Sequence, residues 1–314
     1  MESKVIHFLH CPFTGLGLYG GFRGDRWLRN RIKIFKQFVI PSIQVQTRKD
    51  FVLWIAWRHE EKNNQKVIDL KNYLDSLSIP NVFTYSGICF YDDKYTEEVA
   101  LERLVSSIHS STANLLDTIG EANTVLMTIQ PSDDCYHSTM VQEMRDFFDN
   151  NPDKDLFGYA KGYVMDYVGQ RLSEWNPKTT PPFYTIKFTR DNFVDPLKHM
   201  KFTGPYKSHE YPKDYMKAVY VDTRGFLVGT HGCNISTVFD HPYVGHEFLG
   251  DNIQYVLSDF GLRNVPKLDI PFSLLNLVFL KMPYGMKRKL RFWGSEKKWI
   301  LRPFFGFIYN ILRS

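Results

Sequence analysis

The chain has 314 residues, of which 43% are hydrophobic and 23% charged, so it can bury a sizeable core as a globular protein. Its net charge of +5 is concentrated in residues 281–314, which hold nine lysines and arginines and one glutamate. Residues 1–280 carry 30 basic and 33 acidic groups. A mildly acidic body lacks the basic face that nucleic-acid binding requires, which argues against nucleic acid as a partner.

The four cysteines and the N-terminal segment indicate a cellular location. The cysteines lie far apart and form no C-x-x-C spacing, so neither a zinc knuckle nor a disulfide framework is indicated and a reducing compartment is favoured. Residues 1–13 lack the apolar core of a signal peptide. No segment reaches the roughly 18 uninterrupted apolar residues of a membrane span. We therefore expect a cytoplasmic protein.

Strand-like and helix-like segments alternate through the first 130 residues. Runs of β-forming residues predict strands at 4–9, 51–57, 81–85 and 124–129. Apolar residues at helical spacing predict helices from Arg26 up to Pro41, at 63–77 and at 96–118. Such alternation is typical of βαβ units and predicts a mainly parallel sheet with helices packed on it.

The second half has a different character. Residues 156–175 are aromatic and glycine-containing and favour antiparallel strands, and residues 183–188 and 217–228 again have extended character. A polar, glycine-bearing loop, 230–237, directly follows the last of these segments. We expect residues 1–265 to form one continuous α/β domain.

Residues 266–314 form a separate C-terminal segment in which lysines and arginines alternate with aromatic and aliphatic residues. This composition is typical of a segment that lies in a membrane interface, and it predicts a peripheral protein that contacts a membrane surface through residues 281–314. The alternative is a C-terminal helix that packs on the body with its lysines in water.

Two adjacent carboxylates, Asp133 and Asp134, follow the strand at 124–129 after a single turn containing Pro131. Side chains just beyond the carboxyl end of a parallel strand lie where open α/β sheets bind ligands. Paired carboxylates there favour a hard divalent cation. The alternative is an acidic turn whose aspartates cap the next helix.

Residues 31–51, RIKIFKQFVIPSIQVQTRKDF, resemble the opening of a family of rhamnosyltransferases with a glycosyltransferase A (GT-A) fold. Ser132, Asp133 and Asp134 fall where that family has an acidic motif at the end of its central strand, and the loop from His231 to Asn234 resembles a later loop of the family. The likeness covers about residues 1–240. It implies a GT-A-like, Rossmann-type mixed sheet flanked by helices, followed here by a basic and aromatic helical tail.

The resemblance also implies a ligand and the residues that bind it. In the GT-A fold the acidic motif holds Mn²⁺ or Mg²⁺ against the diphosphate of a nucleotide-sugar, and a later histidine completes the metal's ligands. By matching position, the implied ligands are Asp133, Asp134 and His231. This chain departs from the family at Pro131, which replaces the first acid of the motif. The loss of one carboxylate leaves open a metal-independent or inactive variant.

Other side chains are candidates for binding and catalysis. Arg103, Arg23 or Arg26 would add positive charge beside the diphosphate. If the anomeric centre inverts, a carboxylate must take the proton of the acceptor hydroxyl, and the unranked candidates are Asp166, Glu210, Asp222 and Glu247. For the substrate the candidates are Asn234 and His209, although a satisfied surface histidine is an equally good interpretation of His209.

Three functional hypotheses remain open on the sequence. The first is a glycosyltransferase that moves a sugar from a nucleotide-sugar to a glycan or a lipid-linked glycan, with a divalent cation at the diphosphate. The second is a non-catalytic protein that kept the fold and, because of Pro131, lost the chemistry. The third is a nucleotidyltransferase. The sequence argues against it, because it contains no glycine-rich loop with a basic residue spaced for a triphosphate.

Overall fold

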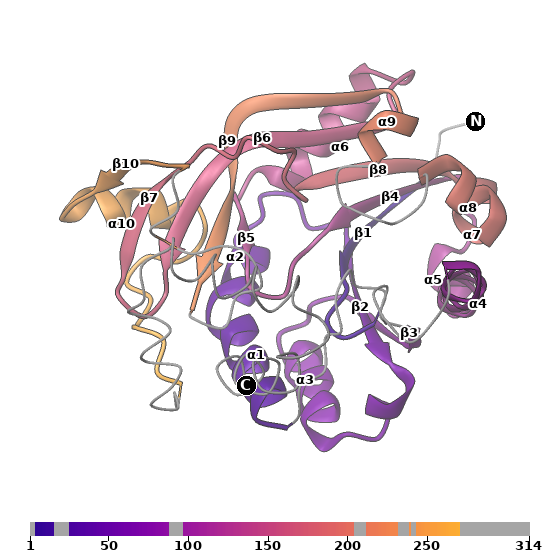
Figure 1. Cartoon of the computed structure of the whole chain (residues 1–314), viewed down its shortest axis with the longest axis horizontal. Coiled ribbons are helices and arrows are strands. Elements are labelled where there is room, and N and C mark those ends of the chain that lie inside the picture. Colours follow the sequence, from indigo (N-terminus) through magenta and orange to yellow (C-terminus); the bar gives the residue numbers. More distant parts are fainter. Residues whose placement is uncertain are drawn as a thin grey trace, which may run out of the picture.

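The structure, a computed structural model, describes residues 4–15, 25–87, 97–203, 212–231, 239 and 243–270. Within these ranges ten strands form one sheet, with β10-β7-β6-β8-β4-β1-β2-β3 as its main path, and β9 pairs with β5 and β6 beside that path (Figure 1). Parallel and antiparallel pairs both occur, and helices cover the sheet. The α/β class with a mixed, helix-flanked sheet that the sequence predicts is confirmed.

The first half of the chain builds the parallel part of the sheet. Its strands are β1 (Val5–Cys11), β2 (Val52–Arg58), β3 (Asn81–Gly87) and β4 (Thr124–Ile129). β1 lies between β4 and β2 and pairs in parallel with both. The first and last residues of all four strands lie within two residues of the predicted bounds. Their carboxyl ends meet at one edge of the sheet, where the acidic pair follows β4.

The second half adds mostly antiparallel strands, as its sequence predicts. β8 (Tyr184–Thr189) pairs antiparallel with β4, and β6 (Leu156–Asp166) and β7 (Arg171–Trp175) form a hairpin. The long β9 (Ala218–Thr230) pairs in parallel with β6 and antiparallel with the short β5 (Cys135–Tyr136). The edge strand β10 (Val244–Phe248) pairs antiparallel with β7. β9 therefore ends at Thr230, close to the segment after β4.

Helices cover both faces of the sheet (Figure 1). One face packs against α1 (Asp25–Ile34), α2 (Ile40–Gln44), α3 (Gln65–Ser76) and α6 (Met140–Asn150). The other face is covered by α4 (Glu97–Ala113), α5 (Leu116–Ile119), α7 (Arg190–Val194) and α8 (Pro196–Thr203). α9 (Pro212–Tyr215) precedes β9, and α10 (Asp251–Ser258) packs beside β6, β7 and β9.

The helix predicted to stop at Pro41 continues beyond it. A π-helical turn, Phe35–Val39, joins α1 to α2, and Pro41 lies in the first turn of α2, which ends at Gln44. A proline lacks an N–H and its ring clashes with the carbonyl four residues earlier, so it is tolerated in the first turn of a helix. The π-helical turn lets a new helix begin before the proline, and the chain stays helical.

The start of the C-terminal segment lies against the body. Leu268 and Ile270 are buried, the Leu268 N–H donates to the Tyr167 carbonyl oxygen at 2.9 Å, and the Gln37 side-chain amide donates to the Pro266 carbonyl oxygen at 2.7 Å. The basic and aromatic residues 281–314 lie outside the described residues. No helix in the described part of the chain is long and apolar enough to cross a membrane.

Candidate active site

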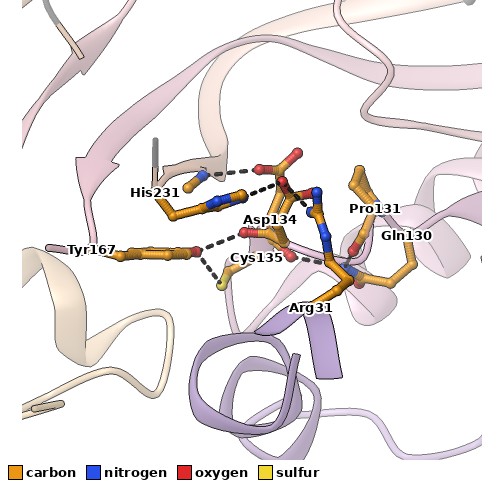
Figure 2. A network of polar contacts seen from close by, with 9 residues as sticks. Arg31, Gln130, Pro131, Asp134, Cys135, Tyr167 and His231 are labelled. Carbon is orange, nitrogen blue, oxygen red and sulfur yellow. Dashed lines mark hydrogen bonds and ion pairs between the residues drawn. The ribbon is translucent and has the colours of Figure 1, made fainter. Parts of the chain in front are cut away.

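A short segment after β4, residues 130–134, sets the directions of the two aspartates and is called the acidic turn below. The Gln130 N–H donates to the His10 carbonyl oxygen at 2.8 Å, which continues the pairing of β1 and β4 by one residue. The Gln130 side-chain amide then donates to the carbonyl oxygens of Pro131, at 3.0 Å, and Asp134, at 2.9 Å. Because one side chain binds the backbone on both sides of the acidic pair, the conformation of this turn is fixed (Figure 2).

Asp133 is the centre of the polar network. Its Oδ2 atom forms an ion pair with Arg31 Nη1 and lies 3.0 Å from His231 Nε2. All three side chains are largely buried: 7% of the Arg31 side chain, 16% of Asp133 and 1% of His231 is exposed. Arg31 reaches the network from α1, and His231 directly follows β9 (Figure 2). Three segments distant in sequence thus meet at one carboxylate oxygen.

Residues of the quoted opening motif hold Arg31 in place by anchoring its helix. The buried Gln46 side chain donates to the His137 carbonyl oxygen at 2.8 Å and accepts from the Val141 N–H at 3.1 Å. The Thr47 N–H donates to the Ser138 carbonyl oxygen at 2.8 Å. These bonds join the end of α2 to the start of α6, immediately after the acidic pair. The helical unit that carries Arg31 is therefore held against the segment that follows Asp133 and Asp134.

Tyr167 supports the site from the other side. Its hydroxyl donates to the Asp133 carbonyl oxygen at 2.8 Å, and its ring stacks on Phe38 with centroids 3.7 Å apart and planes at 8°. A Cβ atom at Gly229 would lie 2.3 Å from the Tyr167 ring and 2.4 Å from the Asp133 carbonyl oxygen. Only glycine fits there, because any side chain would push β9 away from the acidic turn.

The second carboxylate, Asp134, points elsewhere. Its Oδ1 accepts from the Gly229 N–H at 2.9 Å, and the residue is almost fully buried. Burial raises the pKa of the Asp134 carboxyl well above its usual value, and the negative charge of Asp133 adds to that shift. Asp134 thus joins β9 to the acidic turn.

The pKa of Asp133 shifts the other way. Burial alone would raise it, but the positive charge of Arg31 and the hydrogen bond with His231 outweigh burial and hold this pKa below its usual range. Burial lowers the pKa of His231, so its ring stays neutral at pH 7 while its Nε2–H donates to Asp133. The site therefore contains one ionised carboxylate, one guanidinium and one neutral imidazole.

The donor atoms fit a divalent cation in part. Two ligands in neighbouring positions around an ion with bonds of about 2.1 Å lie about 3 Å apart, and Asp133 Oδ2 and His231 Nε2 are separated by 3.0 Å. Among the described residues no group of three or more His, Cys, Asp or Glu side chains is arranged to hold a metal. Asp133 and His231 would hold a cation together only after Nε2 has given up the proton that it donates to Asp133, and substrate oxygens and water would have to supply the other ligands.

The structure separates the general-base candidates. Asp166 ends β6 opposite Thr230, the residue before His231, and its Oδ1 accepts from the Val168 N–H at 3.0 Å. Asp222 lies eight residues before Thr230 on β9, roughly 26 Å along an extended strand, with 78% of its side chain exposed and an ion pair to Lys161. The backbone of Asp166 thus lies beside the residue before His231, with its carboxylate turned toward the loop between β6 and β7, whereas Asp222 is far along β9.

Glu247 lies on the edge strand β10. Its carboxylate accepts two hydrogen bonds from Arg171, from Nε at 2.8 Å and from Nη2 at 2.9 Å. Arg103 is exposed on α4, which packs with α7 and α8 on the face of the sheet opposite to α1. Arg26, in the first turn of α1, is half-buried. The remaining candidates lie outside the described residues: Arg23, His209, Glu210 and Asn234.

Several residues that build the site were not predicted from the sequence. Arg31 was present as the first residue of the family-like opening, and that position is the signal that points to it. Gln130, Tyr167 and Gly229 carry no local signal, because their roles arise from contacts with segments far away in sequence.

Comparisons with known proteins yield only remote likenesses. No family model matches the chain, and no curated protein matches it. Among solved structures the chain is similar to TarS of S. aureus, with 13% identity and a TM-score of 0.34 over 73% of this chain and 37% of that one. The chain thus spans just over a third of TarS.

Two further solved structures are similar at the same level. For 4-diphosphocytidyl-2C-methyl-D-erythritol synthase the identity is 11% and the TM-score 0.35, over 71% of this chain and 89% of that one. For a protein from Desulfovibrio desulfuricans G20 named as a nucleotide-diphospho-sugar transferase the values are 12% and 0.31, over 69% and 78%.

Proposed function

We propose that this protein is a glycosyltransferase that moves a sugar from a nucleotide-sugar donor to a glycan or lipid-linked glycan acceptor. The observation that supports it is the meeting of Arg31, Asp133 and His231 just beyond the carboxyl end of β4. All three belong to the segments that resemble the rhamnosyltransferase family. The carboxyl edge of a parallel sheet is where open α/β folds bind ligands.

Asp133 and His231 would hold Mn²⁺ or Mg²⁺, whereas Asp134, the second acid that the resemblance implies, binds the Gly229 N–H instead. Such a cation, when bound, stabilises the charge that develops on the departing nucleoside diphosphate. Arg31 keeps Asp133 ionised by lowering the pKa of its carboxyl. Tyr167 and Gln130 bind the backbone of the acidic turn, so the carboxylate is already oriented before a donor arrives.

Asp166 is our choice for the general base of an inverting reaction. The acceptor oxygen bonds to the anomeric carbon, the sugar–phosphate bond breaks with its electrons going to the diphosphate, and the acceptor proton passes to the carboxylate. The register of β6 and β9, which sets Asp166 opposite Thr230, supports this choice over Asp222 and Glu247. The two exposed acids are already bound to Lys161 and Arg171.

The experiment is a donor-hydrolysis and transfer assay with UDP-, GDP- and dTDP-sugars, in Mn²⁺ or in EDTA, on wild type, Asp133→Asn and Asp134→Asn. We expect Asp133→Asn to lose at least about 100-fold in rate, a loss of roughly 3 kcal/mol of transition-state stabilisation. Asp134→Asn keeps the oxygen that binds the Gly229 N–H and should lose much less. Full activity of Asp133→Asn would refute the proposal.

A second candidate is a non-catalytic protein that binds nucleotide-sugars or glycans. It is favoured by Pro131, which removes one acid of the family motif, and by the ion pair with Arg31, which already neutralises Asp133. Binding of a nucleoside diphosphate by calorimetry, with no transfer or hydrolysis of any donor tested, would select this candidate. Finer identities, such as rhamnose as the donor sugar, rest on the family resemblance alone.

We also propose that the protein works in the cytoplasm at a membrane surface. What supports this is the charge distribution: residues 281–314 hold nine basic groups against one acid, beside a body with 30 basic and 33 acidic groups. Basic residues interleaved with tryptophan and phenylalanine bind anionic lipid interfaces. A lipid-linked acceptor would then be presented at the surface where the protein binds.

A further inference from the structure

Arg31 contacts the same carboxylate oxygen that a cation at this site requires. Asp133 Oδ2 binds both Arg31 Nη1 and His231 Nε2, and Asp133 and His231 are the residues that would hold the cation. A guanidinium and a divalent cation repel each other at such short range, all the more so where the side chains are buried. Arg31 therefore competes with the cation for Asp133.

The chemistry of Arg31 suggests where it goes when a cation binds. A guanidinium has five N–H donors in a planar fork that matches phosphate oxygens, and it stays charged at all physiological pH values. Its group lies 5.5 Å from the Trp27 ring centroid, on the same helix. A diphosphate that arrives with a cation brings the anionic oxygens that replace Asp133 as the partner of Arg31.

We propose that Arg31 binds the Asp133 carboxylate when no cation is bound and exchanges from Asp133 to the diphosphate when cation and donor bind together. The inference rests on the proposed function, since it assumes a cation and a diphosphate at Asp133. It assigns to Arg31 two opposite effects: Arg31 weakens binding of the cation alone and strengthens binding of the diphosphate. Cation and diphosphate must then bind with strong positive coupling.

The test uses the full chain and measures Mn²⁺ binding by electron paramagnetic resonance and diphosphate binding by calorimetry. Arg31→Met removes the charge and the donor fork but keeps an unbranched apolar side chain. We expect it to bind Mn²⁺ alone about tenfold or more tightly than wild type, because the competing charge is gone. In saturating Mn²⁺ it should bind UDP, GDP or dTDP, whichever wild type binds, about tenfold or more weakly.

Arg145→Met is the matched control. Arg145 is also a largely buried arginine, on α6, whose carboxylate partner is Asp50, at 3.5 Å, and not an acid of the site. It should change neither affinity. Should Arg31→Met fail to fold by circular dichroism, Arg31→Lys replaces it: with its charge kept and its fork lost, Mn²⁺ affinity should stay near that of wild type while diphosphate affinity falls.

The experiment distinguishes failure of the Arg31 exchange from failure of the proposed function. If wild type binds Mn²⁺ with a diphosphate but Arg31→Met binds Mn²⁺ alone no more tightly than wild type does, the exchange is refuted and the proposed function stands. Equal loss of both affinities in Arg31→Met also refutes it, because Arg31 would then only hold the site together. If no protein binds Mn²⁺ with or without any diphosphate, the metal-assisted function fails, and the exchange with it.

Discussion

At the scale of single residues, the site depends on how burial and charge divide the two aspartates. Both are removed from water, which raises a carboxyl pKa, yet only Asp133 has a guanidinium and an imidazole at its carboxylate. Asp133 therefore stays ionised, while Asp134 binds a backbone N–H of β9. Adjacent residues of the same type thus have different chemistry because the chain turns them toward different partners.

The choice of Asp166 as general base gives a prediction at this scale. Asp166→Asn should lower the turnover number for transfer at least about 100-fold and leave donor affinity unchanged, because the carboxylate would touch the acceptor and not the diphosphate. Asp222→Asn is the control, since that exposed acid pairs with Lys161 far along β9. Steady-state kinetics with varied donor and acceptor check both, and equal losses in the two variants would remove Asp166 from the reaction.

A second residue-scale prediction concerns His10, which is buried and stacks on Trp54 with centroids 3.9 Å apart. Neither of its ring nitrogens has a hydrogen-bond partner among the described residues. Burial lowers the pKa of His10 from 6.5 to about 3, with a smaller effect of His199. In the unfolded chain His10 is protonated below about pH 6.5, whereas in the folded chain it stays neutral down to about pH 3. The free energy of unfolding therefore falls as the pH falls from 6.5 to 3.

The variant His10→Phe should keep the ring stack and remove the proton uptake of the unfolded state. We expect it to reduce the loss of unfolding free energy between pH 6.5 and pH 4 by up to about 1.4 kcal/mol per pH unit. Denaturant unfolding at several pH values measures this slope. The wild-type slope retained in His10→Phe would show that this histidine does not titrate as its burial implies.

At the scale of elements, the site is made by fixing three segments against one another. The α1–α2 unit is joined to the start of α6 through Gln46 and Thr47, and β9 is joined to the acidic turn through Gly229. Tyr167 stacks on the π-helical turn and binds the same acidic turn. The functional side chains keep their positions because each comes from an element that is itself hydrogen-bonded to its neighbour.

Gly229→Ala tests the contact between β9 and the acidic turn. The added Cβ atom would meet the Tyr167 ring and the Asp133 carbonyl oxygen at 2.3 and 2.4 Å, so one of them must move. We expect a loss of about 1–3 kcal/mol in unfolding free energy and a large loss of diphosphate binding. Gly245→Ala on β10 is the control, because its nearest contacts are the side chains of Glu174 and Asn176, which can rotate away.

At the scale of the whole molecule, charge is divided between a mildly acidic body and a strongly basic C-terminal segment. The described start of that segment, residues 266–270, is bound to Lys33 at the end of α1, to Gln37 in the π-helical turn and to Tyr167 after β6. A membrane bound by residues 281–314 would therefore be connected by only a short stretch of chain to helix α1, which carries Arg31. Under the proposed function, this connection would let the tail bring the site to lipid-linked acceptors.

Liposome flotation measures this role. The full chain should float with vesicles containing anionic lipid at low salt and float less at high salt, because salt screens the lysines and arginines. A chain truncated after residue 280 should stay at the bottom of the gradient in both conditions. Flotation of the truncated chain equal to that of the full chain would place any membrane-binding surface in the body.

Hydrophobic periodicity and strand length are local properties, so the α/β class, the four parallel strands and the mostly antiparallel second half could be predicted from the amino-acid sequence. It also pointed to Asp133, Asp134 and His231 through a family resemblance. The helix end predicted at Pro41 was wrong, because a π-helical turn lets the helix continue to Gln44. Helices α7 to α10 were not predicted, because their sequences have no strong local pattern.

Which of these residues contact one another depends on how the chain folds. Arg31 and His231 lie far from Asp133 in sequence, and no local pattern records that their side chains meet at one oxygen. Nor does a local pattern distinguish the ionised Asp133 from Asp134, which binds β9. Ionisation depends on burial and on charges brought close by folding, and both are properties of the packed chain rather than of any segment.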